Sequence, residues 1–537
     1  MKKIFFIILF FFCFVGFSQE DAWVYFKAKN NSQRYYDDPL LMLSQRAIDR
    51  RVKQNISLDS KDVPIDISYI NQIKAVLGIT IKAKSKWLNA LHIRGTQTTI
   101  NSLKSFVFVE KIDFANKALN LTGRNVAVAK MKAVNKILET QVDFAYGSSG
   151  NQIQMLHGDV LHQQNYTGSG KIIAVMDTGF PGVNTAQPFK RLRDNNQILG
   201  GYDFVARNAN FYTSDSHGTM VLSCMGGYQE NALVGTAPDA SYYLFRTEDV
   251  SSENPVEESY WVEAAEKADS LGVDIINTSL GYFEFDKTAY NHTYNDMDGK
   301  TAFMTRGAEI AFSRGMIVVA SAGNEGATAN PHIGVPADGI SVLTIGAVDA
   351  SKTVASFSSI GPSFDNRVKP DVVAQGKSVV LSDSSGNIGT ASGTSFSSPI
   401  TAGMVACLWQ AFPNKTNKEI RDLIVKSADR YSVPDNQYGY GIPDYSLALS
   451  NGLGVNDFLV KDVFLYPNPT NDIITVSSNG KFDTGTVRVF SMLGQKITEQ
   501  KITKTVPDIS LKTLQSGIYI YEIDWNGNVT TGKIIKQ

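Results

Sequence analysis

The sequence predicts an α/β protein: a doubly wound parallel sheet in the centre of the chain, preceded by a small α+β unit and followed by a small β-sandwich. Three observations support this prediction. Continuous apolar runs in the central part alternate with helical segments, as in parallel sheets covered on both faces. Mixed helical and strand patterns precede that part, and short alternating segments separated by glycine turns follow it. With 537 residues, 43% of them hydrophobic, the chain can bury several cores.

Residues 1–19 have the pattern of a secretory signal peptide. Lys2 and Lys3 give a positively charged start, and residues 4–17 are almost wholly apolar. This stretch is shorter than the ~18–20 residues that span a bilayer, so a membrane anchor is the less favoured alternative. We therefore expect an exported protein, with cleavage near Gln19, that is either released or attached to the cell surface.

Residues 20–118 are predicted to form the α+β unit, and residues 119–139 a linker rich in Asn, Lys and Ala that holds a processing site. Period-two patterns indicate strands, and helical spacing of apolar residues indicates helices. The expected strands are 23–26, 79–82, 90–93 and 106–112, and the expected helices are 67–77 and 98–103.

The central part, residues 140–452, is predicted to contain the doubly wound sheet, with strands at 171–176, 273–276, 316–320 and 342–347. One helix is indicated by Asn254 as N-cap, Pro255 at the first position and Gly272 past the end. A capping box that begins at Thr416 indicates another helix. The sites of such sheets lie at the carboxyl ends of the strands.

Residues 460–537 are predicted to form the β-sandwich. Their short alternating segments are divided by Asn-Gly, Leu-Gly and Ser-Gly turns, and nothing in them has a catalytic pattern.

Charge and cysteine content exclude some classes of function. The formal net charge is −1, so nucleic acid is not an expected partner. Cys13 falls in the signal peptide, and Cys224 and Cys407 fall in apolar helices, where buried thiols are the ordinary case. The sequence leaves open whether these two cysteines pair, and it offers too few ligands at the right spacing for a zinc site.

A serine-rich turn is the most informative motif. Gly393-Thr394-Ser395-Phe396-Ser397-Ser398 precede Pro399 and an apolar run, 400–409, that predicts a buried helix. Backbone N–H groups at a helix start can stabilise an oxyanion, and a glycine lets a substrate approach closely. Ser395 is therefore a candidate nucleophile, although serine turns before helices are also common N-caps.

Three upstream residues suit the roles of an orienting acid, a base and an oxyanion donor. Asp177 directly follows a buried strand, and His217 stands at the glycine-hinged start of an apolar helix. Asn324 follows the strand at 316–320 and carries an amide that can donate to an oxyanion. Taken alone, Asp177 and Asn324 are more often structural turn residues, and His217 is as often structural as functional. With Ser395, the four together indicate an activated serine.

The order Asp, His, Asn, Ser and the motifs around it resemble the subtilisin-like serine proteases, the subtilases of peptidase family S8. The matching stretches are Ile173-Ala174-Val175-Met176-Asp177-Thr178-Gly179, His217-Gly218-Thr219, Asn277-Thr278-Ser279-Leu280-Gly281, Ala322-Gly323-Asn324-Glu325-Gly326, Phe357-Ser358-Ser359-Ile360-Gly361, Lys369-Pro370-Asp371 and Gly393-Thr394-Ser395.

This resemblance implies a seven-stranded parallel sheet and an endopeptidase that hydrolyses peptide bonds of proteins through an acyl-enzyme. It implies that Asp177 orients His217, that His217 deprotonates Ser395, and that Asn324 and the Ser395 N–H form the oxyanion hole. The implied substrate-binding residues are Ser279, Leu280 and Gly281, which would pair with the substrate as an added strand.

The chain departs from the family pattern in two places. Phe396 and Ser397 stand where the family often has Met and Ala, which predicts altered packing and unchanged chemistry. Residues 282–300 are an insertion beside the substrate strand. We expect a solvated loop there, with a pocket-shaping segment or a calcium site as the alternatives. The chemistry needs no cofactor; structural calcium stays open, because no family site can be matched here.

The flanking units resemble known companions of such proteases. Residues 20–118 resemble the family's inhibitory propeptide in their strand and helix pattern. Residues 460–537 resemble the C-terminal sorting domain of the type IX secretion system of Bacteroidetes, on Tyr466-Pro467-Asn468-Pro469-Thr470 and Leu514-Gln515-Ser516-Gly517-Ile518-Tyr519. The expected partners are thus protein or peptide substrates, the chain's own propeptide and the type IX apparatus. These resemblances imply a zymogen that is exported in two steps.

Two other classes of function remain as alternatives. Asp177-Thr178-Gly179 is also an aspartic-protease signature, with a second copy at Asp483, but the tail around that copy is too small for a lobe. The other alternative is a secreted binding protein on an inactive protease scaffold, against which the intact Asp, His and Ser residues argue.

Overall fold

The computed structural model describes residues 19–30, 32–120, 144–453, 463–466, 468, 470–478, 484–491, 494–503, 506–525 and 528–537. The predicted signal peptide before Gln19, most of the predicted linker, and Asp483 lie outside this part of the chain. The chain divides into two compact units, Met1–Gly452 and Leu453–Gln537.

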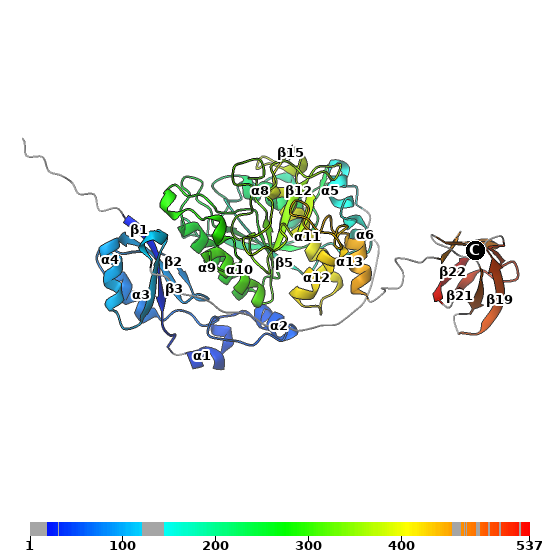
Figure 1. The fold of residues 1–537 in the computed structure, drawn as a ribbon, viewed down its shortest axis with the longest axis horizontal. Coiled ribbons are helices and arrows are strands. Elements are labelled where there is room, and N and C mark those ends of the chain that lie inside the picture. The colour runs from blue at the N-terminus through cyan, green and yellow to red at the C-terminus, as the bar shows by residue number, and fades with distance from the viewer. Residues whose placement is uncertain are drawn as a thin grey trace, which may run out of the picture. The chain divides into compact units, whose positions relative to one another are not determined.

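A seven-stranded parallel sheet forms the centre of the first unit, as the sequence predicts (Figure 1). Its strand order is β13-β12-β11-β10-β5-β9-β6, so the chain reverses its direction of winding between β5 and β10. The strands are β5 (Ile172–Asp177), β6 (Ile198–Asp203), β9 (Ser241–Arg246), β10 (Ile275–Thr278), β11 (Ile317–Ser321), β12 (Leu343–Val348) and β13 (Val372–Gln375).

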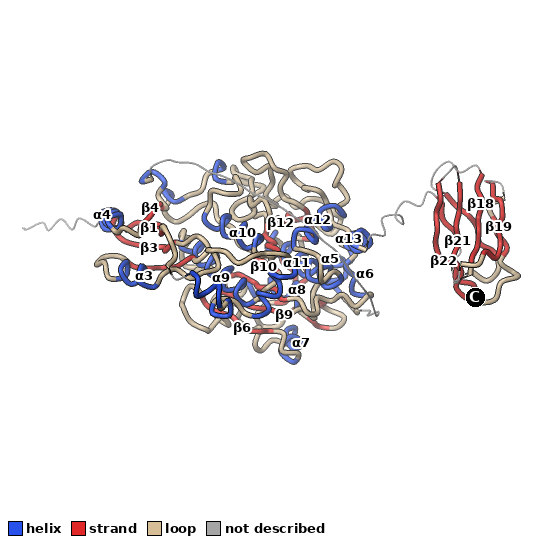
Figure 2. Tube along the Cα trace, turned by 90° about the horizontal axis from the view of Figure 1, so that it is seen from below, coloured by secondary structure: helices blue, strands red, loops and turns tan. Residues whose placement is uncertain are grey.

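Helices cover both faces of this sheet (Figure 2). On one face α8 (His217–Gly226) packs against α11 (Thr394–Ala411), and on the other α9 (Val256–Leu271) packs against α10 (Phe303–Ser313). Strand residues alternate between the two layers because successive side chains point to opposite faces. The smaller helices are α5 (Gly150–Gln154), α6 (Gly158–Gln163), α7 (Lys190–Asp194), α12 (Asn417–Ser427) and α13 (Tyr445–Gly452).

Two short hairpins complete the central region. They are β7 (Tyr228–Gln229) with β8 (Leu233–Val234) and β14 (Val379–Ser382) with β15 (Ile388–Ala391).

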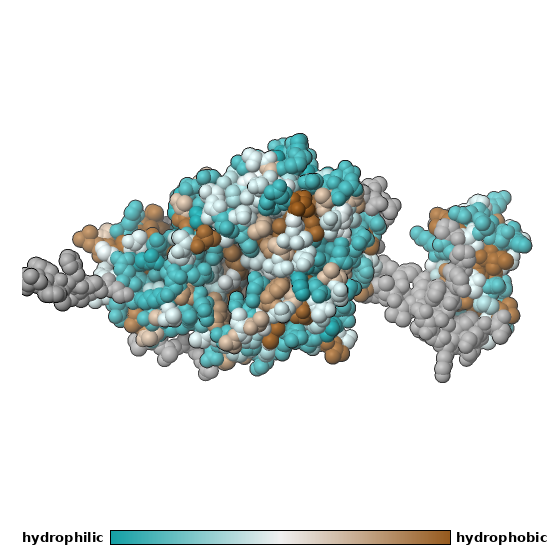
Figure 3. All heavy atoms as spheres, turned by 90° about the horizontal axis from the view of Figure 1, so that it is seen from above, coloured by the Kyte–Doolittle hydropathy of each residue, from teal (hydrophilic) through white to brown (hydrophobic). Residues whose placement is uncertain are grey.

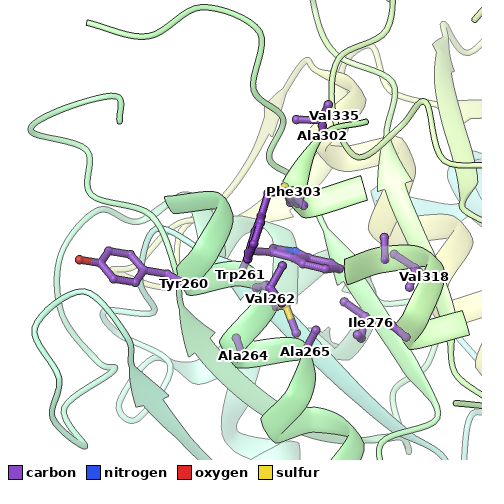
Figure 4. Close-up of a cluster of buried hydrophobic side chains, with 14 of the residues drawn as sticks. Tyr260, Trp261, Val262, Ala264, Ala265, Ile276, Ala302, Phe303, Val318 and Val335 are labelled. Carbon is purple, nitrogen blue, oxygen red and sulfur yellow. The ribbon is translucent and has the colours of Figure 1, made fainter. Parts of the chain in front are cut away.

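The core between the sheet and α9 is built around Trp261 (Figure 4). Its side chain is fully buried among apolar neighbours that include Ile276 and Val318, and its Nε1 donates to Thr278 Oγ1 at 3.0 Å. The indole therefore fills the core while its polar atom stays satisfied, which is the usual condition for burying tryptophan.

The helix-start motifs have different outcomes. Thr416 and Glu419 form the predicted capping box at the start of α12. The prediction that Asn254 caps α9 is wrong: the cap residue is Pro255 and the helix begins at Val256. Glu257 still accepts hydrogen bonds from the backbone N–H groups of Asn254 and Asp249. Its carboxylate therefore satisfies two N–H groups of the loop that precedes the helix.

The N-terminal part is a four-stranded antiparallel sheet with order β2-β3-β1-β4. Both faces of β1 are buried. Val24 and Phe26 face the helices of the N-terminal part, whereas Trp23 and Tyr25 face the central domain. The sequence did not predict two of the four helices, α1 and α2. The elements are β1 (Gln19–Phe26), β2 (Thr80–Ser85), β3 (Ala90–Thr96), β4 (Val109–Phe114), α1 (Ser32–Asp37), α2 (Gln45–Lys53), α3 (Ile67–Lys74) and α4 (Gln97–Ser102).

This N-terminal sheet docks on α9 and α10. Trp23 stacks on Phe303 with ring centroids 5.0 Å apart. The buried carboxylate of Glu266 accepts hydrogen bonds from Ser85 Oγ at 2.6 Å and from the backbone N–H groups of Lys86 and Trp87, both at 2.9 Å. The contact therefore combines apolar burial with a carboxylate of α9 that accepts the hydrogen bonds of a turn in the N-terminal part.

Helix α2 adds a second contact, at the end of α9. Arg50 and Arg51 are buried and both pair with Asp269, at 2.5 and 2.8 Å. Arg51 also binds Asp62, within the N-terminal part, at 2.8 Å. Burying an arginine carries a desolvation penalty that a paired carboxylate offsets, and here each arginine has such a partner.

The expectation of a solvated loop at 282–300 is wrong. Tyr290, His292 and Asp296 are buried in this insertion. Tyr290 Oη donates to Glu20 Oε2 at 3.1 Å, and Lys117 Nζ pairs with Asp296 at 2.6 Å. The insertion is thus covered by the N-terminal part, a partner that the local pattern could not show.

The second unit consists of two antiparallel sheets around one apolar core, in line with the predicted β-sandwich. One sheet has the order β16-β17-β20 and the other β19-β18-β21-β22. The strands are β16 (Val463–Tyr466), β17 (Ile473–Ser478), β18 (Thr484–Phe490), β19 (Lys496–Thr503), β20 (Asp508–Ser510), β21 (Gly517–Trp525) and β22 (Asn528–Lys536).

The surface and the cysteines are unremarkable. The face shown in Figure 3 is largely hydrophilic, with apolar residues in small separate patches. Within the described residues, no helix combines the length and apolar content needed to cross a bilayer. Cys224 and Cys407 are both buried free thiols.

We predict that Thr416→Ala lowers the free energy of unfolding by about 1 kcal/mol, because the Glu419 N–H loses the hydroxyl oxygen that caps it at the start of α12. Urea denaturation of a Ser395→Ala chain, which avoids self-digestion, measures the change. Thr416→Ser keeps the hydroxyl and is the control. Equal losses in the two variants would contradict the capping argument.

Candidate active site

Asp177 and His217 meet at the carboxyl end of β5. Asp177 is the last residue of that strand and is fully buried, and His217 is the first residue of α8. His217 Nδ1 lies 2.7 Å from Asp177 Oδ1. A Cβ added to Gly218 would lie 2.9 Å from Asp177 Cβ and 2.4 Å from the Gly179 carbonyl oxygen, so glycine allows this close approach.

The electrostatics of the pair favour a protonated imidazole. Burial lowers the pKa of His217, but the charge and hydrogen bond of Asp177 outweigh it, with further contributions from Asp215 and Glu248. The pKa of His217 is therefore raised above its ordinary value of 6.5. A carboxylate in this position stabilises the imidazolium that forms when the histidine accepts a proton.

Ser395 lies in the first turn of α11 and lines the same cleft as His217. The helix begins at Thr394, six residues before the apolar run that predicted it. Ser395 is 9% exposed, and its Oγ donates to the carbonyl oxygen of Ser279 at 3.3 Å. Among the described residues, the serine hydroxyl and the imidazole are thus bonded to other groups and not to each other. Catalytic hydrogen bonds of this type often tighten only with substrate bound.

Asn324 is held through its amide oxygen, and within the described residues its amide nitrogen has no hydrogen-bond partner. Its Oδ1 accepts from Thr394 N at 2.9 Å and from Thr394 Oγ1 at 3.0 Å. A Cβ placed on Gly393 would lie 3.7 Å from both Asn324 Nδ2 and Ser395 N. Two N–H donors therefore border the space that this glycine keeps open.

The cleft around these residues has a volume of about 720 Å³. Ser279, Leu280 and Gly281, which follow β10, form part of its wall. Ser279 is fixed by a hydrogen bond from its Oγ to the Ser395 carbonyl oxygen at 2.8 Å. In the described part of the chain, the backbone groups of Leu280 and Gly281 have no hydrogen-bond partner. They are thus available to an added strand.

Sequence reasoning missed two residues that hold the site. Asp215 accepts a hydrogen bond from His217 N at 2.8 Å, and Arg246 Nε donates to the Thr178 carbonyl oxygen at 3.0 Å. Asp215 had a usable signal, a short acid two residues before a helix start, whereas the role of Arg246 depends on a contact between distant segments. Phe396, where the sequence predicted altered packing, is buried with its ring centroid 5.8 Å from that of His217.

Comparison with known proteins identifies the family. Residues 168–441 match the model of the subtilase family, which covers half of the chain. The chain therefore belongs to the subtilase family, and it is a serine endopeptidase. That membership removes the aspartic-protease alternative.

Individual relatives agree with this assignment. Subtilisin NAT of Bacillus subtilis subsp. natto is 32% identical over 293 residues, 54% of this chain and 68% of the relative. Subtilisin DY of Bacillus licheniformis is 29% identical over 278 residues, 51% of this chain and 90% of the relative. Serine protease AprX of Bacillus subtilis strain 168 is 30% identical over 312 residues, 52% and 66% of the two chains.

The two flanking regions also match family models. Residues 21–133 match a peptidase S8 propeptide domain of Bacteroidota, and residues 464–537 match a secretion system C-terminal sorting domain. The chain thus has a propeptide domain before its peptidase domain and a sorting domain after it, as the sequence resemblances implied.

We predict that Asp177→Asn lowers the pKa of His217, because the main charge that opposes the effect of burial is removed. A histidine NMR titration of the Ser395→Ala chain measures it. Asp215→Asn is the comparison and is expected to shift the pKa downward by less. An unchanged pKa in Asp177→Asn would show that this carboxylate does not control the imidazole.

Proposed function

We propose that this chain is a secreted endopeptidase, made as a self-processing zymogen, in which Asp177, His217 and Ser395 form the catalytic triad. The observation that carries this proposal is the 2.7 Å contact between Asp177 Oδ1 and His217 Nδ1 at the edge of the cleft that Ser395 lines. The family of the chain supports it, because the triad order Asp, His, Ser is that of the subtilases.

In the proposed reaction, Ser395 Oγ attacks the carbonyl carbon of the substrate while His217 Nε2 takes its proton. To do so, the hydroxyl rotates away from the Ser279 carbonyl oxygen. Asp177 keeps the imidazole in the right tautomer and stabilises the imidazolium. His217 then donates the proton to the leaving amine, and a water molecule activated by the same histidine hydrolyses the acyl-enzyme.

Asn324 Nδ2 and Ser395 N are the proposed oxyanion donors. Their convergence beside Gly393 supports this role. In subtilisin, loss of one such donor lowers kcat roughly 10²–10³-fold. We expect a similar loss here because the chain belongs to the same family. Extended substrate would pair with Ser279, Leu280 and Gly281. None of these steps requires a metal ion.

The N-terminal part, residues 20–118, is proposed to act as an inhibitor and folding template until it is cleaved off. Its two contacts with α9, through Glu266 and through Asp269, support an extensive docked state. The following residues, 119–139, would contain the processing site. The peptidase domain would extend over residues 140–452.

Export is proposed to occur in two steps. A signal peptide at residues 1–19 would direct the chain across the inner membrane, and the sorting domain, residues 460–537, would direct it through a type IX apparatus to the cell surface or the medium. The match of the C-terminal region to a sorting domain supports the second step.

We predict that a fluorophosphonate probe labels the matured wild-type enzyme and does not label Ser395→Ala, because only the activated serine reacts. Gel fluorescence measures the labelling. Ser397→Ala, which removes a buried hydroxyl from the same helix turn, is the matched control and should still be labelled. Matured enzyme that resists the probe would overturn the proposed triad.

We also predict that the active enzyme begins between residues 118 and 140, whereas Ser395→Ala stays uncleaved there because it cannot cut itself. N-terminal sequencing of both proteins measures this. Active enzyme that still begins near residue 20 would contradict the zymogen proposal and leave the triad untouched.

A further inference from the structure

The active-site cleft is lined by acidic side chains. Five carboxylate side chains line it, and within the described residues no lysine or arginine does. They are Asp215, Glu248, Glu253, Glu284 and Glu325. A cleft with one sign of charge concentrates ligands of the opposite sign.

Two glutamates of the loop between β9 and α9 and a third in the first turn of α9 form a tight cluster beside this cleft. The carboxylate oxygens of Glu248, Glu253 and Glu257 lie within 4.8 Å of one another. Glu248 and Glu257 are buried, at 9% and 0% exposure. None of the three forms an ion pair with a lysine, arginine or histidine in the part of the chain that the structure describes.

The hydrogen bonds of the cluster do not supply the missing charge. Glu248 accepts from Tyr282 Oη at 2.5 Å, and Glu257 accepts from the backbone N–H groups of Asp249 and Asn254. Asp286 adds another carboxylate beside Glu253. Burial and then repulsion within the cluster raise the pKa of Glu248 and of Glu257. Burial and then repulsion by Asp286 raise the pKa of Glu253 to about 7. Buried carboxylates in such a group are costly unless a cation joins them.

The cluster lies where a bound peptide would pass. Glu248 is close enough to Asp177 and His217 to interact with both electrostatically. Its partner Tyr282 directly follows Gly281, the end of the segment proposed to pair with substrate. A peptide strand along that segment would therefore bring side chains near the scissile bond over the cluster, since alternate residues of a strand share a face.

We propose that Glu248, Glu253 and Glu257 bind the ammonium or guanidinium group of a substrate lysine or arginine, so that the enzyme prefers a basic residue within about four positions of the scissile bond. This inference rests on the proposed function, because it assigns a substrate class to the same cleft. A charged partner would complete the cluster, whereas a neutral one would leave its carboxylates uncompensated.

The chain's own processing segment fits this preference. Residues 119–139 contain four basic residues and one acidic residue. The basic residues are Arg124, Lys130, Lys132 and Lys136, and the acidic one is Glu139. Most bonds in this segment lie within four residues of one of these basic side chains.

The test compares matched peptides that carry Lys, Gln or norleucine at each of the four positions before the scissile bond. At one of these positions, we expect the matured wild-type enzyme to cleave the Lys peptide with a kcat/KM at least about tenfold higher than the matched Gln and norleucine peptides. Glu248→Gln and Glu253→Gln should each reduce the ratio of kcat/KM for the Lys peptide to that for the norleucine peptide to about twofold or less. Glu248→Asp should restore part of it. Glu230→Gln, an exposed glutamate outside the cleft, is the control and should keep the full preference.

Two outcomes would overturn the inference, and a third would refute the proposed function. Equal cleavage of Lys and norleucine peptides by the wild-type enzyme would refute the inference while leaving the triad intact. So would a loss of activity toward all peptides in Glu248→Gln that added Ca²⁺ reverses, since the cluster would then be a metal site. Loss of probe labelling and of all cleavage in the wild-type enzyme would instead refute the proposed function on which the inference rests.

Discussion

The buried contact between Asp177 and His217 is the interaction on which the arrangement of the site depends. Asp177 can sit at full burial because it ends a strand of a sheet that is covered on both faces, and because a histidine shares its charge. Gly218 lets α8 approach β5 closely enough for this contact, and Asp215 fixes the helix start. The sheet therefore supplies both the rigidity and the low dielectric that make the pair strong.

The same sheet explains why distant segments meet at one edge. Residues after β5, β10 and β11 come together there because parallel strands place all their carboxyl ends on one side. Helix α11 adds Ser395 by packing across β10 to β13. The N-terminal part uses the opposite helical layer: it docks on α9 and α10, so docking and the cleft occupy different surfaces of one core.

Much of the fold and the proposed site could be predicted from the sequence. Apolar runs predicted the central strands, and Asp177, His217, Asn324 and Ser395 each stood next to such a run or at a helix start. The errors came from contacts that no local pattern encodes. The insertion at 282–300 was expected in solvent because its partner, the N-terminal part, lies more than 150 residues earlier in the chain. Helix α2 was missed because its arginines are buried by pairing with Asp269.

By itself, the sequence determined the family, the order of the domains and the residues proposed for catalysis, because these depend on motifs whose chemistry is local. Only the tertiary structure decided which groups surround them. Glu248, Glu253 and Glu257 look like ordinary surface acids in the sequence, and folding gathers them within 4.8 Å beside the cleft, which Glu248 and Glu253 line. The reason is physical: a catalytic motif needs a defined local turn, whereas a charge cluster depends on how loops and helices pack.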